Sequence, residues 1–268
     1  MQTPRLKKVI EQAYTLGKQL GIQVWCEDEA GPYQTVPYAG HHWQPEQRPI
    51  CQPHEYIRNG TAKILTLFHP ATGQVRLKGV TDSTNATLHA WLKQQLTAIL
   101  ADRPLEWPSA TYIADNRLAW ERWRDGLTVK ATLSHVLPRL RLLLVMDNLV
   151  GHKNPHWLCW CFSMGILPIF TPLSGSWLNM AESIQRLLKR RALDGTAPVM
   201  VQTIIDQFEA VARHWNQQPT PFIWAGKRRT RRQPSHLRRY PLGGSATITR
   251  RAVSRRSNYN TLANHLTH

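Results

Sequence analysis

The sequence predicts an α/β fold in which helices flank a mixed sheet. Residues 140–148 contain a long apolar run, which is typical of a strand covered on both faces. Residues 61–80 have the pattern of a β-hairpin, so the sheet should also hold antiparallel strands. Helical patterns alternate with the later strands, which favours helices packed against the sheet.

The first half of the chain begins with an amphipathic helix over residues 4–20, which Gly21 ends. Residues 22–28 follow as a strand with two different faces. The Gly- and Pro-rich segment after it predicts a loop with a short strand around His42 and Trp43.

The hairpin over residues 61–80 has its turn at "HPATG". A helix is expected over residues 84–102, with Thr84 or Asn85 as N-cap and apolar residues at helical spacing. Residues 103–139 contain two Trp-rich pieces and predict a mixed connector.

The second half begins with the buried strand at 140–148. The remaining elements are predicted in order as a helix at 153–165, a strand at 166–172, and helices at 176–192 and 200–216. Pro155 suits the first turn of its helix. The domain organisation expected is an N-terminal linker helix (1–20), an α/β domain (21–216) and a basic C-terminal tail (217–268).

The net charge of the 268-residue chain is +17, and it is unevenly placed. Residues 227–256 hold eleven Lys and Arg residues and no acid. Such an excess indicates a polyanionic partner, most often nucleic acid, contacted through phosphates. The alternative is a solubilising terminus.

The four cysteines show no disulfide-framework spacing, and there is no signal peptide or apolar run near 18 residues. We therefore expect a reduced, cytoplasmic protein without a membrane span.

Two aspartates follow predicted strands. In α/β sheets, functional groups gather beyond the carboxyl ends of the strands. Asp28 ends the strand at 22–28, and Asp147 ends the most buried strand. The pleat favours Asp28 over its neighbours Glu27 and Glu29 as the residue on the core side. The alternative for either aspartate is an Asx-turn or a helix cap.

Glu182 is the third candidate. On the predicted helix it lies off the apolar stripe, where an i,i+4 pair with Arg186 is an alternative role. Three carboxylates together would offer hard oxygen ligands to two Mg²⁺ or Mn²⁺ ions, which can activate a hydroxyl and stabilise the leaving oxygen of a phosphodiester.

The segments "LLLVMDNLVGHK" and "ILPIFTPLSGSWLNMAES" resemble the catalytic core of DDE transposases, in the mariner-related bacterial insertion-sequence branch. Between Asp147 and Glu182 lie 34 residues, a spacing which that branch favours. "CEDEAGPYQTVPYAGHHW" is similar to the strand that carries the family's first Asp. The resemblance covers residues 5–250.

The resemblance implies an RNase H-like fold, divalent-metal catalysis, and cleavage and transfer of DNA strands in transposition. It implies Asp28, Asp147 and Glu182 as the catalytic, metal-binding triad. Asn148 and His152 match further recurrent positions of the family, and we expect Asn179, with Trp177, to shape the turn before Glu182.

The resemblance also implies double-stranded DNA, both transposon ends and target, as partner, and a location with the nucleoid in the bacterial cytoplasm. A homodimer is a further expectation. Family members usually carry helix-turn-helix modules before this domain, and only 27 residues precede Asp28. We therefore expect a separately encoded N-terminal DNA-binding half, a truncated remnant or an incorrectly assigned start.

DNA contacts are expected from the basic helix end and from the tail. The residues concerned are Lys189, Arg190, Arg191, Lys227, Arg228, Arg229, Arg231 and Arg232. For the helix end, a solvated basic face is the alternative.

Three alternatives stay open. A zinc site from His152, His156, Cys159 and Cys161 has ligand spacing that is unusual for zinc. The chain could instead be a catalytically silent transposon remnant that only binds DNA. It could also be another RNase H-like nuclease, although such nucleases usually need a fourth acid.

Overall fold

The computed structural model describes residues 3–40, 47 and 51–224. Its sheet has the strand order β3-β2-β1-β4-β5. The strands are β1 (Gln23–Gln34), β2 (Thr61–His69), β3 (Gln74–Val80), β4 (Leu142–Met146) and β5 (Ile166–Phe170). β2 pairs antiparallel with both β1 and β3, whereas β4 is parallel to β1 and β5 is parallel to β4. The prediction of an RNase H-like mixed sheet flanked by helices is confirmed.

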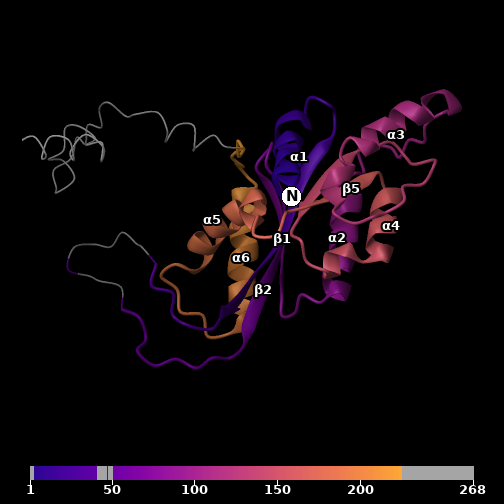
Figure 1. The fold of residues 1–268 in the computed structure, drawn as a ribbon. Coiled ribbons are helices and arrows are strands. Elements are labelled where there is room, and N and C mark those ends of the chain that lie inside the picture. Colours follow the sequence, from indigo (N-terminus) through magenta and orange to yellow (C-terminus); the bar gives the residue numbers. More distant parts are fainter. Residues whose placement is uncertain (1–2, 41–46, 48–50, 225–268) are drawn as a thin grey trace, which may run out of the picture. The chain divides into compact units, whose positions relative to one another are not determined.

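The helices pack on both faces of this sheet. They are α1 (Thr3–Leu16), α2 (Asn85–Ile99), α3 (Ile113–Glu121), α4 (Pro155–Ser163), α5 (Ala181–Leu193) and α6 (Val201–Trp215). Four short 3₁₀ turns complete the elements: η1 (Ala110–Tyr112), η2 (Arg124–Leu127), η3 (Gly151–Lys153) and η4 (Ser176–Leu178). Figure 1 shows α5 and α6 on one side of the sheet and α2 and α4 on the other.

The two faces of β1 therefore look onto different helices. The Tyr14 hydroxyl on α1 lies 3.2 Å from Cys26 Sγ, and Gln185 on α5 donates to Thr66, the partner of Asp28 on β2. Since side chains alternate along a strand, Cys26 and Asp28 share the face of α1 and α5. Glu27 and Glu29 belong to the opposite face, which α2 and α4 cover.

α1 belongs to the hydrophobic core, although we expected a linker helix there. Ile10 and Ala13 are fully buried, and both lie in the single core cluster. Residues 217–224 are the described part of the expected tail, and its Arg-rich segment lies outside the described residues.

Two boundary predictions are wrong. β1 continues six residues past Asp28 to Gln34, because the strand accommodates a register shift between Ala30 and Tyr33 instead of ending. The helix predicted over 176–192 is broken, since Asn179 has extended backbone angles between η4 and α5. α5 therefore begins at Ala181, five residues later than predicted.

Several local predictions are confirmed. The hairpin forms from β2 and β3, and Thr84 caps α2 by accepting a hydrogen bond from the Thr87 N–H. Asn154 caps α4, with Pro155 in its first turn. The expected strand around His42 and Trp43 lies outside the described residues.

Among the described helices, none combines the length and the hydropathy that crossing a membrane would require.

Candidate active site

The parallel pairing of β1 with β4 brings Asp28 and Asp147 to the same level of the sheet. Cys26 is in register with Val145. Asp28 lies two residues after Cys26, and Asp147 lies two residues after Val145. Asp147 comes directly after the last residue of β4, as the sequence predicts. The two carboxylates come from distant parts of the chain, yet the sheet places them on adjacent strands.

Asp28 is half-buried and lies in the field of two other acids. Burial, together with the negative charges of Asp147 and Glu182, raises the pKa of Asp28 to about 7. One Asp28 oxygen accepts a 3.0 Å hydrogen bond from the Glu29 N–H, and this bond lowers the pKa of Asp28. Asp147 and Glu182 are therefore both close enough to Asp28 to act on it electrostatically.

The segment before α5 places Glu182 in the first turn of that helix. Asn179 is buried, and its side-chain amide donates a 2.6 Å hydrogen bond to the backbone carbonyl of Glu27. Its side-chain oxygen accepts from the Ala181 N–H. This residue thus connects the beginning of α5 to β1 and sets the position of Glu182.

Glu182 also makes the surface pair that its spacing predicts. Arg186 Nη2 lies 3.0 Å from Glu182 Oε2, and the Arg186 side chain is 78% exposed while that of Glu182 is 24% exposed. An exposed i,i+4 pair of this kind stabilises a helix by only a few tenths of a kcal/mol. The pair and the interaction with Asp28 coexist.

Asp147 makes the Asx-turn contact that was considered as its alternative role, and it also lies next to His152. Its Oδ1 accepts a 3.2 Å hydrogen bond from the Leu149 N–H, which is the contact of an Asx-turn. The same oxygen lies 2.7 Å from Nδ1 of His152, although the angle at this nitrogen falls outside the range of a hydrogen bond.

His152 is buried among acids. Its Nε2 lies 3.8 Å from Glu29 Oε1, and its Nδ1 lies 4.0 Å from Glu27 Oε2. Burial alone would lower the pKa of His152, but its contacts with Asp147 and Glu29 and the charge of Glu27 raise it to about 10. The surrounding carboxylates therefore favour the protonated form of His152, which lies next to Asp147 of the predicted triad.

Glu27 is the site residue that sequence reasoning missed. It is completely buried, neither of its oxygens has a hydrogen-bond partner, and burial raises its pKa to about 8. We expected Asp28 to be on the core side of β1. In the structure helices cover both faces of the sheet. Glu27, whose side chain points to the face opposite Asp28, is therefore buried more deeply than Asp28.

The other predicted residues are placed less centrally. The Asn148 side-chain oxygen accepts a hydrogen bond from Lys153 Nζ, and Trp177 is 42% exposed and stacks on Trp224 at 6.2 Å. The alternative zinc set is not assembled, because His156 and Cys159 are exposed at the surface of α4 whereas Cys161 is buried.

Of the residues expected to contact DNA, Lys189 and Arg190 are exposed on α5. Arg191 is also exposed, with its guanidinium 5.2 Å from the centroid of the Trp215 ring. Lys227, Arg228, Arg229, Arg231 and Arg232 lie outside the described residues.

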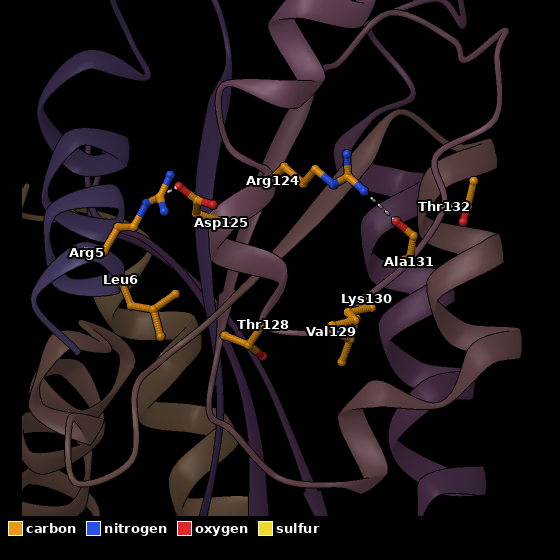
Figure 2. Close-up of a pocket in the computed structure, with 9 residues that line it drawn as sticks. All are labelled: Arg5, Leu6, Arg124, Asp125, Thr128, Val129, Lys130, Ala131 and Thr132. Carbon is orange, nitrogen blue, oxygen red and sulfur yellow. Dashed lines mark hydrogen bonds and ion pairs between the residues drawn. The ribbon is translucent and has the colours of Figure 1, made fainter. Parts of the chain in front are cut away.

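A separate recess of about 420 Å³ lies between α1 and the segment after η2. Figure 2 shows two of its cations engaged: Arg5 is ion-paired to Asp125 at 2.6 Å, and Arg124 donates to the Ala131 carbonyl. The triad residues do not line it.

No protein-family model matches the chain, and no curated protein matches it. Solved structures do match. The catalytic core domain of BIV integrase is 14% identical over 80% of this chain and 100% of that one, with a TM-score of 0.38. A chain of a pre-cleavage Mos1 transpososome is 13% identical over 81% of this chain and 61% of that one, with a TM-score of 0.36.

A chain of a simian T-cell lymphotropic virus intasome is 13% identical over 83% of this chain and 60% of that one, with a TM-score of 0.40. This chain thus spans less than two thirds of the Mos1 and intasome chains. Because these similarities are low, the description of the fold rests on the strand order and strand directions reported above.

Proposed function

We propose that this chain is the catalytic domain of a DDE transposase, which cleaves DNA strands and transfers them with divalent metal ions. The observation that carries the proposal is that Asp147, at the end of β4, and Glu182, on α5, both lie close enough to Asp28 on β1 for their charges to act on it. The sequence resemblance given above supports the same three residues.

The charge pattern supports a nucleic-acid substrate. The chain carries a net charge of +17, yet its candidate site collects carboxylates, which would repel phosphates. Such a combination suits a polyanionic substrate. The basic residues would bind its phosphates, and metal cations would neutralise the carboxylates that otherwise repel them.

The three side chains fit Mg²⁺ or Mn²⁺, because carboxylate oxygens are hard ligands and the mutual repulsion around Asp28 is relieved by a cation. Asp28 and Asp147 would bridge or flank the ions, and Glu182 would complete the second site. Two bound ions supply a more nucleophilic water or 3′-hydroxyl and stabilise the leaving oxygen of the phosphodiester.

The protein's own residues keep the acids in place. Asn179 holds the start of α5 against β1, and His152 lies against Asp147. Lys189 and Arg190, exposed on the same helix as Glu182, would contact the DNA backbone.

We further propose that the chain acts on transposon ends and target DNA as a homodimer. We place it in the mariner-related bacterial insertion-sequence branch, and a DNA substrate would locate it with the nucleoid in the cytoplasm.

The test is nicking of supercoiled plasmid DNA in Mg²⁺ or Mn²⁺ by the full chain and by Asp147→Asn. We expect metal-dependent nicking that Asp147→Asn abolishes while circular dichroism shows an intact fold. Asp206→Asn, at an exposed acid on α6, is the matched control and should nick like the wild type. Equal activity of wild type and Asp147→Asn would contradict the proposal and favour a DNA-binding remnant. Cleavage of RNA–DNA hybrids in preference to duplex DNA would favour a different RNase H-like nuclease.

A further inference from the structure

The face of β1 opposite Asp28 holds a second group of polar side chains. Glu27, Glu29 and His152 each offer one ligand atom, and these atoms all lie within 4.8 Å of one another. Glu27 is 0% exposed and His152 is 3% exposed, whereas the Glu29 side chain is 22% exposed. The group is thus buried at its base and accessible on the side of Glu29.

Unpartnered polar atoms concentrate around this group. Among the described residues, seven buried side-chain nitrogen and oxygen atoms have no hydrogen-bond partner. Five of them are both Glu27 oxygens, His152 Nδ1, His89 Nε2 and Trp157 Nε1. Buried polar atoms are rarely left without partners, and of these five the two Glu27 carboxylate oxygens are acceptors that a bound cation would satisfy.

His89 on α2 lies at the edge of the same group. It stacks on Trp157 with ring centroids 4.9 Å apart, and the charges of His152 and Glu29 both act on it. His89 from α2 and His152 from η3 therefore bring two imidazole rings to this group.

We propose that Glu27, Glu29 and His152 form a binding site for one transition-metal cation of the Zn²⁺ or Mn²⁺ kind, separate from the Asp28–Asp147–Glu182 triad. An imidazole with two carboxylates is a ligand set that zinc and manganese accept, whereas Mg²⁺ prefers oxygen ligands and water. Asp147 Oδ1 lies against His152 Nδ1, so Nε2, which faces Glu29, is the nitrogen left for the ion.

This arrangement gives the ion a structural role. A carboxylate that contacts the second nitrogen of a metal-bound histidine orients its ring, and here that carboxylate is Asp147. A cation bound on the far face would therefore fix the position of Asp147 through His152. The inference concerns metal binding alone and does not depend on the proposed DNA cleavage.

Zinc binding by the metal-stripped full chain tests the proposal, measured by calorimetric titration with Zn²⁺. Glu27→Gln and Glu29→Gln each remove one ligand and keep the shape of the side chain. Glu182→Gln is the matched control, because it alters the triad and leaves this group intact. Zinc bound by surface histidines and cysteines should be common to all four proteins.

We expect the wild type and Glu182→Gln to bind one zinc ion that both other variants bind at least about tenfold more weakly. X-ray absorption at the zinc edge of the wild type should show an imidazole ligand. The proposal is overturned if Glu27→Gln and Glu29→Gln bind zinc like the wild type. It is also overturned if Glu182→Gln alone loses the ion or if the ion has only oxygen ligands, since either result places the ion in the triad.

Discussion

The side-chain amide of Asn179 donates a 2.6 Å hydrogen bond to the backbone carbonyl of Glu27 and so joins the start of α5 to β1. The contact is buried, and the same side chain accepts from the Ala181 N–H. The position of Glu182 relative to Asp28 therefore depends in part on this amide, beside the hydrogen bond from Gln185 on α5 to Thr66 on β2.

Asn179→Ala should lower the free energy of unfolding by about 1–3 kcal/mol, because it leaves a buried donor and a buried acceptor without partners. Asn179→Asp separates the two bonds, since a carboxylate can accept from the Ala181 N–H but cannot donate to the Glu27 carbonyl. We expect a smaller loss for Asn179→Asp, measured by urea unfolding. Unchanged stability of Asn179→Ala would contradict the role assigned to this contact.

Asp28→Asn should stabilise the metal-free protein at pH 8. The pKa of Asp28 is raised from 3.8 to about 7, so the folded state binds the extra proton and loses stability as the pH rises from about 4 to about 7. An amide removes this loss, and each kcal/mol gained should raise Tm by about 2–4 °C. Thermal unfolding of both proteins in the presence of a chelator measures this difference in Tm. Adding Mg²⁺ should reverse the order, because only the wild type gains the full stabilisation of bound metal. A lower Tm for Asp28→Asn in chelator would argue against repulsion at this site.

Acid should destabilise the protein through His69 at the end of β2. Burial lowers the pKa of His69 from 6.5 to about 4, so the unfolded state binds the proton first and stability falls as the pH drops from about 6.5 to about 4. His69→Phe retains a ring to stack on Trp25, where the centroids are now 4.9 Å apart. Urea unfolding of both proteins across this pH range should give a shallower decline for His69→Phe. Parallel pH curves would show that the pKa of His69 does not differ between the folded and the unfolded state.

Arg186→Ala should change the free energy of unfolding by less than about 0.5 kcal/mol, since the Arg186 side chain is 78% exposed. Plasmid nicking should persist in this variant, whereas Glu182→Gln should abolish it. The comparison separates the surface pair from the function of the carboxylate. A loss of nicking in Arg186→Ala as large as that in Glu182→Gln would assign the role to the pair.

Lys189→Ala should weaken DNA binding to a similar extent for all sequences and reduce the slope of log affinity against log salt by about 1. Lys18→Ala is the matched control, because Lys18 is exposed just before the first strand, at the end of β1 away from Asp28. Fluorescence anisotropy with duplex DNA at several salt concentrations measures both. Equal slopes for the two variants would remove Lys189 from the DNA-binding surface.

The sequence predicts the sheet and most helices because their signals are local. The apolar run of β4 and the N-cap at Thr84 each depend on neighbouring residues alone. The break at Asn179 could not be predicted in this way, since its cause is a hydrogen bond to Glu27, on another element. The position of Glu182 off the apolar stripe also leaves open whether it faces Asp28, because that depends on how α5 is placed against β1.

The buried acid on β1 was accessible to sequence reasoning in part. Trp25, Glu27 and Glu29 occupy alternate positions and share one face of the strand. The sequence does not show that α2 and η3 cover this face, or that His152 approaches it. Whether a carboxylate becomes isolated from water depends on those tertiary contacts, and only the folded chain supplies them.

The pairing of Cys26 with Val145 has a consequence for how the protein acquires its site. The two strands that carry the aspartates are neighbours in space but distant along the chain, so this contact closes a very long loop. Contacts of that kind form slowly and late in folding. During synthesis Asp28 is made before β4 and α5, so Asp147 and Glu182 become available to it only later. A chain interrupted before α5 would hold Asp28 and Asp147 but lack Glu182.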